Sequence, residues 1–597
     1  MTAGDAGSPG SAARGHLALV CACFLLSGLS ALVFQVAWIE ELTRVFGASQ
    51  PAVAAVLAAY MGGLAAGAGI AARWLLPRLG RPILAYAWIE LAIGASALAV
   101  PFMVDAAARL QAAVFESGAR GPGFAMVFSL AVAFLVLIVP TSLMGATLPI
   151  LARFVITAEE HIGSRIGALY TTNTLGGALG AWGAAFFLMP SLGLELTVLV
   201  AVSINGIVGL LAALAHFLAG GAAAGGPIEE PPERPLEPAS PSSESGGGGG
   251  VWILPAILIS GVISFTYEVL WTRLLSHLLG SSTYAFGTML ATFLVGLALG
   301  GAAGGRMARS REAARMQFAV TQVAIAAVSW AAFVNLDRLA GLQQVPFTGA
   351  VPGPPGALLC AATLLPGAFF IGATFPQAVR ALAPSARGTA VASGRVLVWN
   401  TCGAIAGATG AGFLLLPALR FSGTLAACVA ASLALAAAAS LVERPRRKGW
   451  ALGCLAGLAV FGSLAPPPPD SLIRSSPFSG GPRQGSLDFY AVGRTSTVTA
   501  LGTAAGYRLS TDGLPEAVLQ RPGALASRFS IARWLSLLPV AYRPDAESML
   551  LVGLGGGLTV EEVPSTVRRI RVVELEAEVL LANRALAAKR RVDPLAD

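Results

Sequence analysis

The chain has 597 residues, of which 55% are hydrophobic and only 12% are charged, and its mean hydropathy is +0.72. Soluble domains carry about 25% charged residues, so this composition excludes an ordinary soluble protein and predicts an integral membrane protein. The formal net charge of +8 does not indicate nucleic-acid binding, because arginine in cytoplasmic loops explains it more simply.

The cysteines and histidines give no sign of a metal site or a disulfide. All six cysteines fall in apolar segments, where we expect small buried side chains. The four histidines are scattered and none has ligand spacing with another histidine or cysteine. The polar start from Met1 to Gly15 leads into a full-length apolar span, so we expect a first transmembrane helix and no cleavable signal peptide.

About twelve apolar spans follow one another along the chain. Most have the roughly 20 residues that cross a bilayer, and each must be helical because lipid cannot satisfy free backbone groups. Arginines gather after the even-numbered spans, so we expect a cytoplasmic N-terminus. Arginine greatly outnumbers lysine, which suggests a GC-rich bacterial genome and a bacterial plasma membrane. The spans start near His16, Pro51, Pro82, Phe124, Ile166, Leu194, Trp252, Thr283, Met316, Pro354, Ala392 and Ser422.

The membrane part is an internal duplication. The stretch Leu26–Trp38 returns as Ile259–Trp271, and the motif Gly-Ala-Thr-x-Pro that ends at Pro149 returns ending at Pro376. A unit of roughly 200 residues with several elements is a duplicated half-domain. Six spans in each unit make the two halves parallel, as in a major-facilitator transporter.

Paired glycines recur at helix-packing spacing in both halves. Two glycines four residues apart lie on one helix face and let another backbone approach closely, so tight packing is favoured over a gating hinge. Asn173 and Asn400, which are equivalent in the repeat, are expected to form interhelical hydrogen bonds. The glycine pairs are Gly63 and Gly67, Gly296 and Gly300, Gly176 and Gly180, and Gly403 and Gly407.

Glu90 and Glu268 are the clearest carboxylates inside the spans. In the repeat alignment Glu268 falls on Gln35 and Glu90 on Gln322. A carboxylate at membrane depth costs a few kcal/mol or more and is a functional hypothesis by default. We hypothesise that both acids bind a cationic substrate, plausibly a polyamine, near the interface of the halves. The alternative is that each lies near a helix end, capped by water or by an arginine such as Arg273.

The chain after Pro466 changes character and predicts a soluble tail. Alternating patterns indicate a small antiparallel sheet with a turn at Asp512-Gly513, then a helix over about 524–538. Strand Ser548–Val552, a glycine loop, a second strand ending at Glu574 and a helix follow in the order of a nucleotide-binding unit. Gly553, Gly555, Gly557 and Glu574 would then contact a ligand, and a purely structural turn is the alternative.

These residues resemble bacterial membrane proteins in which a transporter-like region is fused to a spermidine-synthase-like domain. The motifs are Ser260 to Trp271, Gly-Ala-Thr-x-Pro, Asn-Thr-x-Gly, Leu509–Gly513, and Val552–Gly557 with Val572–Glu574. The resemblance implies polyamine biosynthesis by aminopropyl transfer, with S-adenosylmethionine or its decarboxylated form as co-substrate, no metal, and Asp512 as a substrate-binding residue.

The tail departs from that family where activity would be decided. Gly556 stands where the synthases carry an aspartate, and the family's catalytic aspartate lies beyond Asp597. We therefore assign no catalytic residue. The half-domain is truncated, vestigial or completed by a partner. The alternative function is a twelve-span transporter or membrane scaffold, whose tail binds a nucleotide-like ligand or nothing, and a homo-oligomer is left open.

The predicted fold class is thus a mainly helical polytopic membrane protein of about twelve, possibly thirteen, spans with a small β-sheet and a truncated Rossmann-like unit at its end. The apolar segment 449–465 is a possible extra span, with an interfacial or re-entrant placement favoured. The predicted divisions are repeat 1 over 1–218, a disordered acidic and glycine-rich linker over 219–250, repeat 2 over 251–448, the apolar segment 449–465, a β-rich region over 466–547 and the Rossmann-like unit over 548–597.

Overall fold

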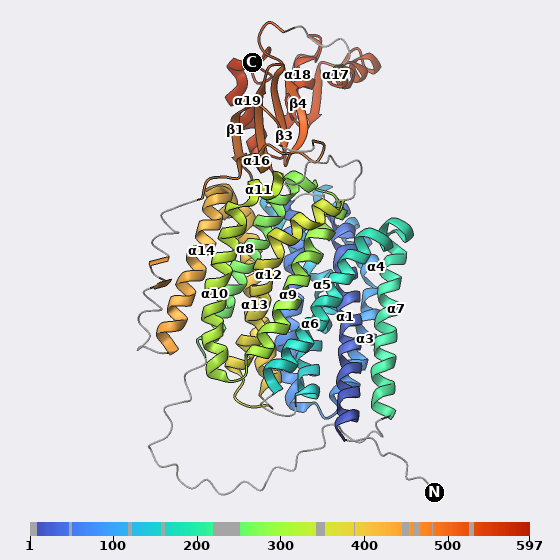
Figure 1. Ribbon diagram of the computed structural model, residues 1–597. Helices are drawn as coiled ribbons and strands as arrows, with labels where there is room; N and C mark the ends of the chain where they lie inside the picture. Colours follow the sequence, from blue (N-terminus) through green and yellow to red (C-terminus); the bar gives the residue numbers. More distant parts are fainter. Residues whose placement is uncertain are drawn as a thin grey trace, which may run out of the picture.

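A bundle of long helices carries a smaller mixed domain on one end (Figure 1). The predicted linker 219–250 and most of the apolar segment 449–465 lie outside the residues that the structure describes. The structure is a computed structural model, and it describes residues 9–46, 50–116, 122–156, 161–218, 251–341, 353–386, 388–443, 453–454, 456–457, 466–479, 482–524 and 530–596.

The helices of the bundle fall into two series. The first series is α1 (Pro9–Phe46), α2 (Gln50–Ile70), α3 (Pro82–Ala97), α4 (Val100–Glu116), α5 (Pro122–Val155), α6 (Ile162–Gly183) and α7 (Met189–Leu218). The second series is α8 (Ile253–Leu279), α9 (Thr283–Met307), α10 (Arg311–Val334), α11 (Leu336–Gly341), α12 (Pro354–Leu382), α13 (Thr389–Gly410) and α14 (Leu416–Glu443). Short π-helical or 3-10 segments continue some of them, namely η1 (Ala71–Leu75), η2 (Leu76–Arg78), η4 (Ala184–Leu188) and η5 (Ala411–Leu415).

Ten helical runs in the described residues are long and apolar enough to cross a membrane. Two of them, Ile162–Phe217 and Thr389–Val442, have 56 and 54 residues, which is more than twice the length of one span. The backbone leaves the helical conformation inside these runs at Gly193 and at Arg420, so each run supplies two spans. The predicted mainly helical, multi-pass membrane fold is confirmed.

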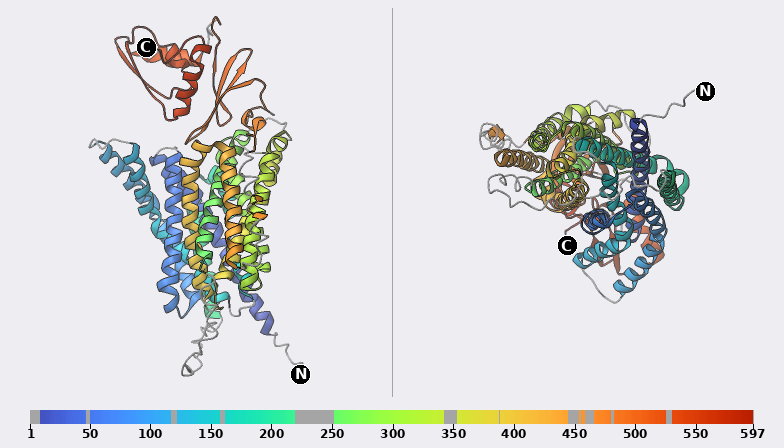
Figure 2. Two further views of the ribbon diagram at one scale, coloured as in Figure 1. Left: turned by 90° about the vertical axis from the view of Figure 1, so that its left-hand side faces the viewer. Right: turned by 90° about the horizontal axis from the view of Figure 1, so that it is seen from below.

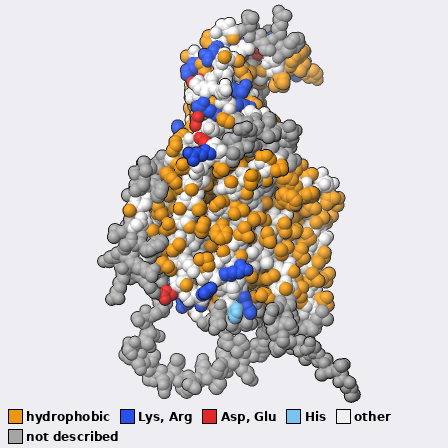
Figure 3. All heavy atoms as spheres, in the orientation of Figure 1, with side chains coloured by type: hydrophobic (Ala, Val, Ile, Leu, Met, Phe, Trp, Pro, Cys, Tyr) orange, Lys and Arg blue, Asp and Glu red, His pale blue; other side chains and the backbone are white. Residues whose placement is uncertain are grey.

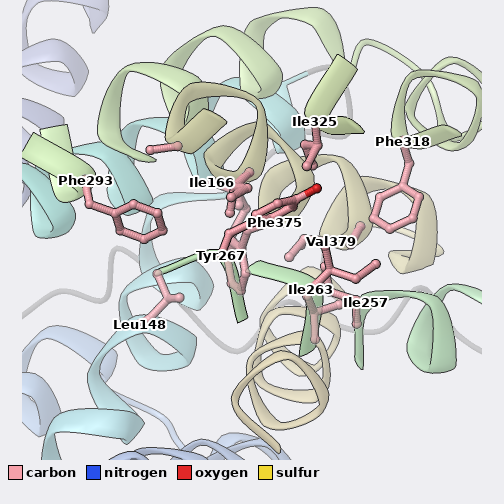
Figure 4. Close-up of a cluster of buried hydrophobic side chains, with 14 of the residues drawn as sticks. Leu148, Ile166, Ile257, Ile263, Tyr267, Phe293, Phe318, Ile325, Phe375 and Val379 are labelled. Carbon is pink, nitrogen blue, oxygen red and sulfur yellow. The ribbon is translucent and has the colours of Figure 1, made fainter. Parts of the chain in front are cut away.

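The two series pack in the same way. In the first, α1 packs on α6, α2 on α5 and α3 on α7, and in the second, α8 packs on α13, α9 on α12 and α10 on α14. The halves meet where α6 packs on α9 and α2 on α13. Buried side chains of both halves share one core, in which Leu148 and Ile166 lie near Tyr267, Phe293 and Phe375 (Figure 4).

Glycines allow the closest helix contacts, as predicted. A Cβ atom added to Gly67 would lie 1.7 Å from the Ser142 carbonyl oxygen, and one added to Gly300 would lie 1.7 Å from the Phe369 carbonyl oxygen. Real Cβ atoms do not approach a backbone oxygen this closely. These positions therefore seat α2 against α5 and α9 against α12, which confirms tight packing as the role of these glycines.

Hydrophobic side chains cover the flank of the bundle (Figure 3). Many large ones are exposed, among them Trp88 at 66%, Phe102 at 76% and Leu358 at 69%. A soluble protein rarely exposes apolar patches of such extent, and the hydrocarbon of a bilayer is the solvent that accepts them. The lipid bilayer is therefore the environment of this surface.

The tail, by which we mean the described residues from 466 onward, contains the predicted antiparallel sheet. Strands β1 (Ser486–Val492), β2 (Thr497–Thr503), β3 (Gly506–Thr511) and β4 (Leu514–Leu519) pair in sequence order. A parallel pair, β5 (Ser548–Val552) and β6 (Arg569–Val573), follows. The helical pieces are α16 (Asp470–Ile473), α17 (Ile531–Tyr542), α18 (Leu558–Glu561), α19 (Ala577–Leu586) and η7 (Ala587–Lys589). The helix expected from 524 begins at Ile531, and residues 525–529 lie outside the description.

The tail sits on the end of the bundle opposite to the start of α1 (Figures 1 and 2). The start of α14 is also at that end, because the Arg420 guanidinium lies 5.4 Å from the centre of the Tyr490 ring. The last residue of α14, Glu443, is then about 35 Å away at 1.5 Å per residue. Before the tail begins, Cys454 packs on Ala436 and Ala437 of α14. Glu443 and the start of the tail thus lie at opposite ends of the bundle.

Candidate functional site

Glu268 lines a small cavity within the second half. It lies on α8, eleven residues and about 16 Å before the end of the helix at the tail. The space that no atom fills between the lining side chains is about 250 Å³, but this figure includes open solvent, and the cavity itself is only about 10 Å³. Its wall comes from three helices, with Glu268 and Thr272 on α8, Phe286, Met289, Leu290 and Phe293 on α9, and Leu364 on α12.

The Glu268 carboxylate makes no hydrogen bond or ion pair with any residue that the structure describes. The arginine that could have capped it points elsewhere, because Arg273 Nη1 donates to the Gly493 carbonyl oxygen of the tail at 2.9 Å. A charge at the centre of a span costs about 2.5–3.5 kcal/mol or more unless it is compensated. The carboxylate therefore calls for a proton or for a cation from outside the protein.

Glu90 has a different environment. It is fully buried, and it accepts hydrogen bonds from Ser27 Oγ and from Asn205 Nδ2, each at 2.6 Å. These residues lie on α3, α1 and α7, so the carboxylate ties three helices of the first half together. In the second half the Gln322 amide donates to Ser260 Oγ at 2.9 Å. Glu90 does not line the cavity of Glu268, so the structure does not bring the two acids into one site.

Asn173 and Asn400 mark equivalent close contacts between helices. The Asn173 carbonyl oxygen would lie 2.1 Å from a Cβ on Gly28, and that of Asn400 would lie 2.5 Å from a Cβ on Gly261. Neither side chain hydrogen-bonds with a described residue, contrary to the expected interhelical bonds. The helices touch through the backbone carbonyl groups of these asparagines, which lie against Gly28 and Gly261.

The glycine loop of the tail and Glu574 meet as the sequence pattern predicts. Gly553, Gly555 and Gly557 all have positive φ, which only glycine adopts without strain. The Glu574 carboxylate accepts from the Leu554 amide at 2.7 Å and from the Gly555 amide at 3.3 Å. One carboxylate oxygen is thus used by the loop itself, and the other accepts from the Glu576 amide at 2.9 Å. This geometry favours the structural turn, and a ligand at these residues stays a prediction.

The far side of that loop is also braced. Asn583 Nδ2 donates to the Gly555 carbonyl oxygen at 2.8 Å, and Arg590 Nη2 donates to that of Gly556 at 2.6 Å. Arg590 is paired with Glu561 as well, and both side chains are buried. The parallel pair β5 and β6 with its loop therefore forms a stiff substructure. A Rossmann-like S-adenosyl unit gains no further support from it.

Asp512 lies at the junction between the tail and the bundle. Its φ is +47°, and its Oδ1 accepts from the Thr497 amide at 2.8 Å, which fixes the predicted turn. Burial raises the pKa of Asp512, and the nearby Arg273 guanidinium opposes that rise. The residue thus faces a buried arginine of the membrane helix α8. Its assignment as a substrate ligand stays a prediction.

Sequence reasoning missed this junction as a feature. Arg273 and His277 lie one turn apart at the end of an apolar span, and that spacing was the available signal. His277 is fully buried, neither ring nitrogen has a partner among the described residues, and its ring packs against Phe421 of α14. Within the described part of the chain no group of three or more His, Cys, Asp or Glu residues is placed to hold a metal ion.

Comparison with known proteins returns no family model and no curated protein that matches the chain. Among solved structures, the crystal structure of a bacterial homologue of the iron transporter ferroportin in an outward-facing state is similar. It shares 14% identity, and the match covers 72% of this chain and 99% of that one with a TM-score of 0.44. The predicted membership of the membrane-fused spermidine synthases is corrected, because no family model and no curated protein matches the chain in support of it.

Proposed function

We propose that the chain is a membrane transporter, that a small cation binds in the Glu268 cavity of the second half, and that the two six-span halves move against each other during transport. The repeated helix pairings and the glycine contacts between helices support two halves built on one plan. Transporters of this kind place their substrate site between helices near the middle of the bilayer. The cavity of Glu268 has such a position on α8.

The observation that carries the proposal is the Glu268 carboxylate, which has no partner among the described residues and lines a cavity. The rest of the wall is apolar or aromatic apart from Thr272. Aromatic faces attract a cation, with a contribution of about 0.5–2 kcal/mol, and apolar walls accept a hydrocarbon body. We therefore expect a substrate with one positive charge and an apolar body. A polyamine is not favoured, since none of the described residues that line the cavity is a second acid.

Uptake by reconstituted protein tests this. Proteoliposomes with the full chain should accumulate labelled tetraethylammonium saturably when a membrane potential, negative inside, is imposed. Glu268→Gln should reduce that uptake at least tenfold, because the amide cannot balance the charge. The matched control is Glu90→Gln, which changes an acid of the first half that does not line the cavity and should keep more than half of the uptake. Equal uptake by Glu268→Gln and the unaltered protein would refute the role of Glu268.

The orientation in the membrane is part of the proposal. Arg73 and Arg78 follow α2, and Arg306, Arg309 and Arg311 lie at the end of α9, away from the tail. Because cytoplasmic sides carry an excess of arginine, these residues support an N-terminus in the cytoplasm of a bacterial cell and a tail outside it. A protease added to intact spheroplasts should remove the tail. Protection of the tail until the cells are lysed would reverse the orientation.

A further inference from the structure

The tail is held by the second half of the bundle. It packs on α8, α11 and α14, and among the described residues no helix of the first half packs against it to a similar extent. The Leu472 amide of the tail donates to Oδ1 of Asp337, a residue of α11, at 3.2 Å. If the halves move against each other, the tail is placed to move with the half that contains Glu268.

One of these contacts is made by α8, the helix that carries Glu268. Arg273 is only 9% exposed, although it is charged, and its hydrogen bond to the Gly493 carbonyl oxygen crosses from α8 into the tail. Its Nε and Nη2 atoms have no partner within the described structure. A buried arginine with one hydrogen bond is costly unless the surrounding carboxylates compensate it. The burial of the Arg273 side chain therefore depends on its contacts with the tail.

Gly493 is confined between Arg273 and two acids of the tail. A Cβ added to Gly493 would lie 2.1 Å from Glu576 Oε1 and 2.5 Å from Glu578 Oε2. Glu576 also accepts from the Thr495 and Ser496 amides, at 3.1 and 2.9 Å, which fixes the turn that carries Gly493. The two carboxylates thus fix the position of the Gly493 carbonyl group, which accepts the hydrogen bond from Arg273.

The junction between Arg273 and the tail lies close to the proposed binding site along α8. Arg273 follows Glu268 by five residues, or about 7.5 Å of continuous helix, and Thr272 beside it lines the cavity. The Gly513 backbone packs closely on the His277 carbonyl oxygen, which would lie 2.7 Å from an added Cβ, so the last turn of α8 is held as well. A shift of the tail must therefore move the wall of the cavity.

We propose that the tail is a regulatory clamp on α8, which controls through the Arg273–Gly493 contact how readily the Glu268 cavity opens to solvent. The clamp proposal rests on the proposed function in one respect only, namely that the cavity binds a substrate. The clamp itself can be measured without transport. It also assigns the tail a role that needs no S-adenosyl ligand.

The test is the rate at which a thiol inside the cavity reacts. Thr272→Cys is introduced into the full chain in which the six native cysteines are replaced, and labelling by methanethiosulfonate ethylammonium is followed in nanodiscs. Gly493→Ala, which lies in the tail and drives a methyl group into Glu576 and Glu578, should raise the labelling rate at least fivefold. The control Glu516→Ala, at an exposed position of β4, should leave the rate unchanged.

Two results would overturn the clamp. One is a labelling rate within twofold of the unaltered protein for Gly493→Ala, and this holds even if that variant unfolds the tail, since an unfolded tail has also released α8. The other comes from a double-mutant cycle with Arg273→Gln. If Gly493→Ala acts through Arg273, it adds nothing in the Arg273→Gln background, whereas additive effects show that the two residues act independently. Neither labelling experiment depends on uptake. If the uptake assay showed no role for Glu268, both labelling results would still test the clamp.

Discussion

Gly193 and Arg420 adopt the same left-handed backbone at the same place in the two halves. Their φ and ψ angles are 74° and −178° for Gly193, and 56° and −169° for Arg420. The two residues are 227 positions apart, as are Asn173 and Asn400, and a π-helical segment precedes each of them. Only one of the two residues is glycine. The packing of helices within each half, and not the conformational preference of the residue, therefore imposes this break in the helix.

Arg420→Gly is expected to stabilise the protein. A non-glycine residue in this region of backbone conformation costs about 1–3 kcal/mol, and glycine would remove that strain. The substitution also removes the contact between the guanidinium and the Tyr490 ring, worth about 0.5–1 kcal/mol at such sites. We expect a net gain of about 1 kcal/mol, measured by thermal unfolding in detergent.

Gly193→Ala is the matched control for that prediction. No atom lies within 4 Å of a Cβ at Gly193, so the substitution tests backbone strain without a steric clash. It should destabilise the protein by about 1–3 kcal/mol. A lower unfolding temperature for Arg420→Gly, together with no effect of Gly193→Ala, would show that the break is not strained.

The sequence predicted the spans and the duplication well, because both depend on local patterns. Apolar runs identify helices in a membrane, and repeated motifs such as Gly-Ala-Thr-x-Pro identify the halves. The break at Arg420 could not be foreseen, since arginine has no preference for that conformation. The end of the bundle that carries the tail was also beyond reach, because the segment 449–465 is short for a span and the contact between Arg420 and Tyr490 is visible only in the fold.

The two membrane acids show why the site was only half predictable. Glu90 and Glu268 look alike in sequence, each with a glutamine at the equivalent position of the other half. Their difference lies in partners that are distant along the chain, since Ser27 and Asn205 are 63 and 115 residues from Glu90. The family resemblance failed for a similar reason, because short motifs within apolar helices reflect packing as readily as they reflect descent.

Glu90→Gln should be tolerated and Glu90→Ala should not. A glutamine can accept from Ser27, and its amide can donate to Asn205 Oδ1, which is buried without a partner. The second half already uses Gln322 at this place. Alanine would leave two buried polar groups unsatisfied, at about 1–3 kcal/mol each. Thermal unfolding should give this order, and equal loss with Gln and Ala would indicate that the charge itself is needed.

Gly300→Ala should be among the most damaging single changes in the bundle. The added methyl group would meet the Phe369 carbonyl oxygen of α12, which cannot move without shifting the helix. Gly410→Ala is the control, because no atom lies within 4 Å of its Cβ. There alanine should be neutral or gain up to about 1 kcal/mol from its higher helix propensity. The yield of folded protein and its unfolding temperature measure both, and similar values for the two variants would contradict close packing as the reason for Gly300.

The stability of the tail should fall as the pH rises from 5 to 8 through the Glu576–Glu578 pair. The hydrogen bond to the Glu576 carboxylate raises the pKa of Glu578 to about 7, and burial adds to that rise. The unfolded chain binds this proton with a pKa of about 4.3. The stability that the proton contributes is therefore fully present below pH 4.3 and is lost as the pH approaches 7.

Glu578→Gln isolates that contribution. The amide can donate to Glu576 at every pH, so the variant should match the unaltered protein near pH 4 and be more stable than it at pH 8. Hydrogen exchange of the β1 and β2 amides in the full chain measures the tail alone. Glu547→Gln, at an exposed position before β5, should follow the unaltered protein throughout. If the difference between Glu578→Gln and the unaltered protein does not grow between pH 5 and 8, the two carboxylates do not share a proton.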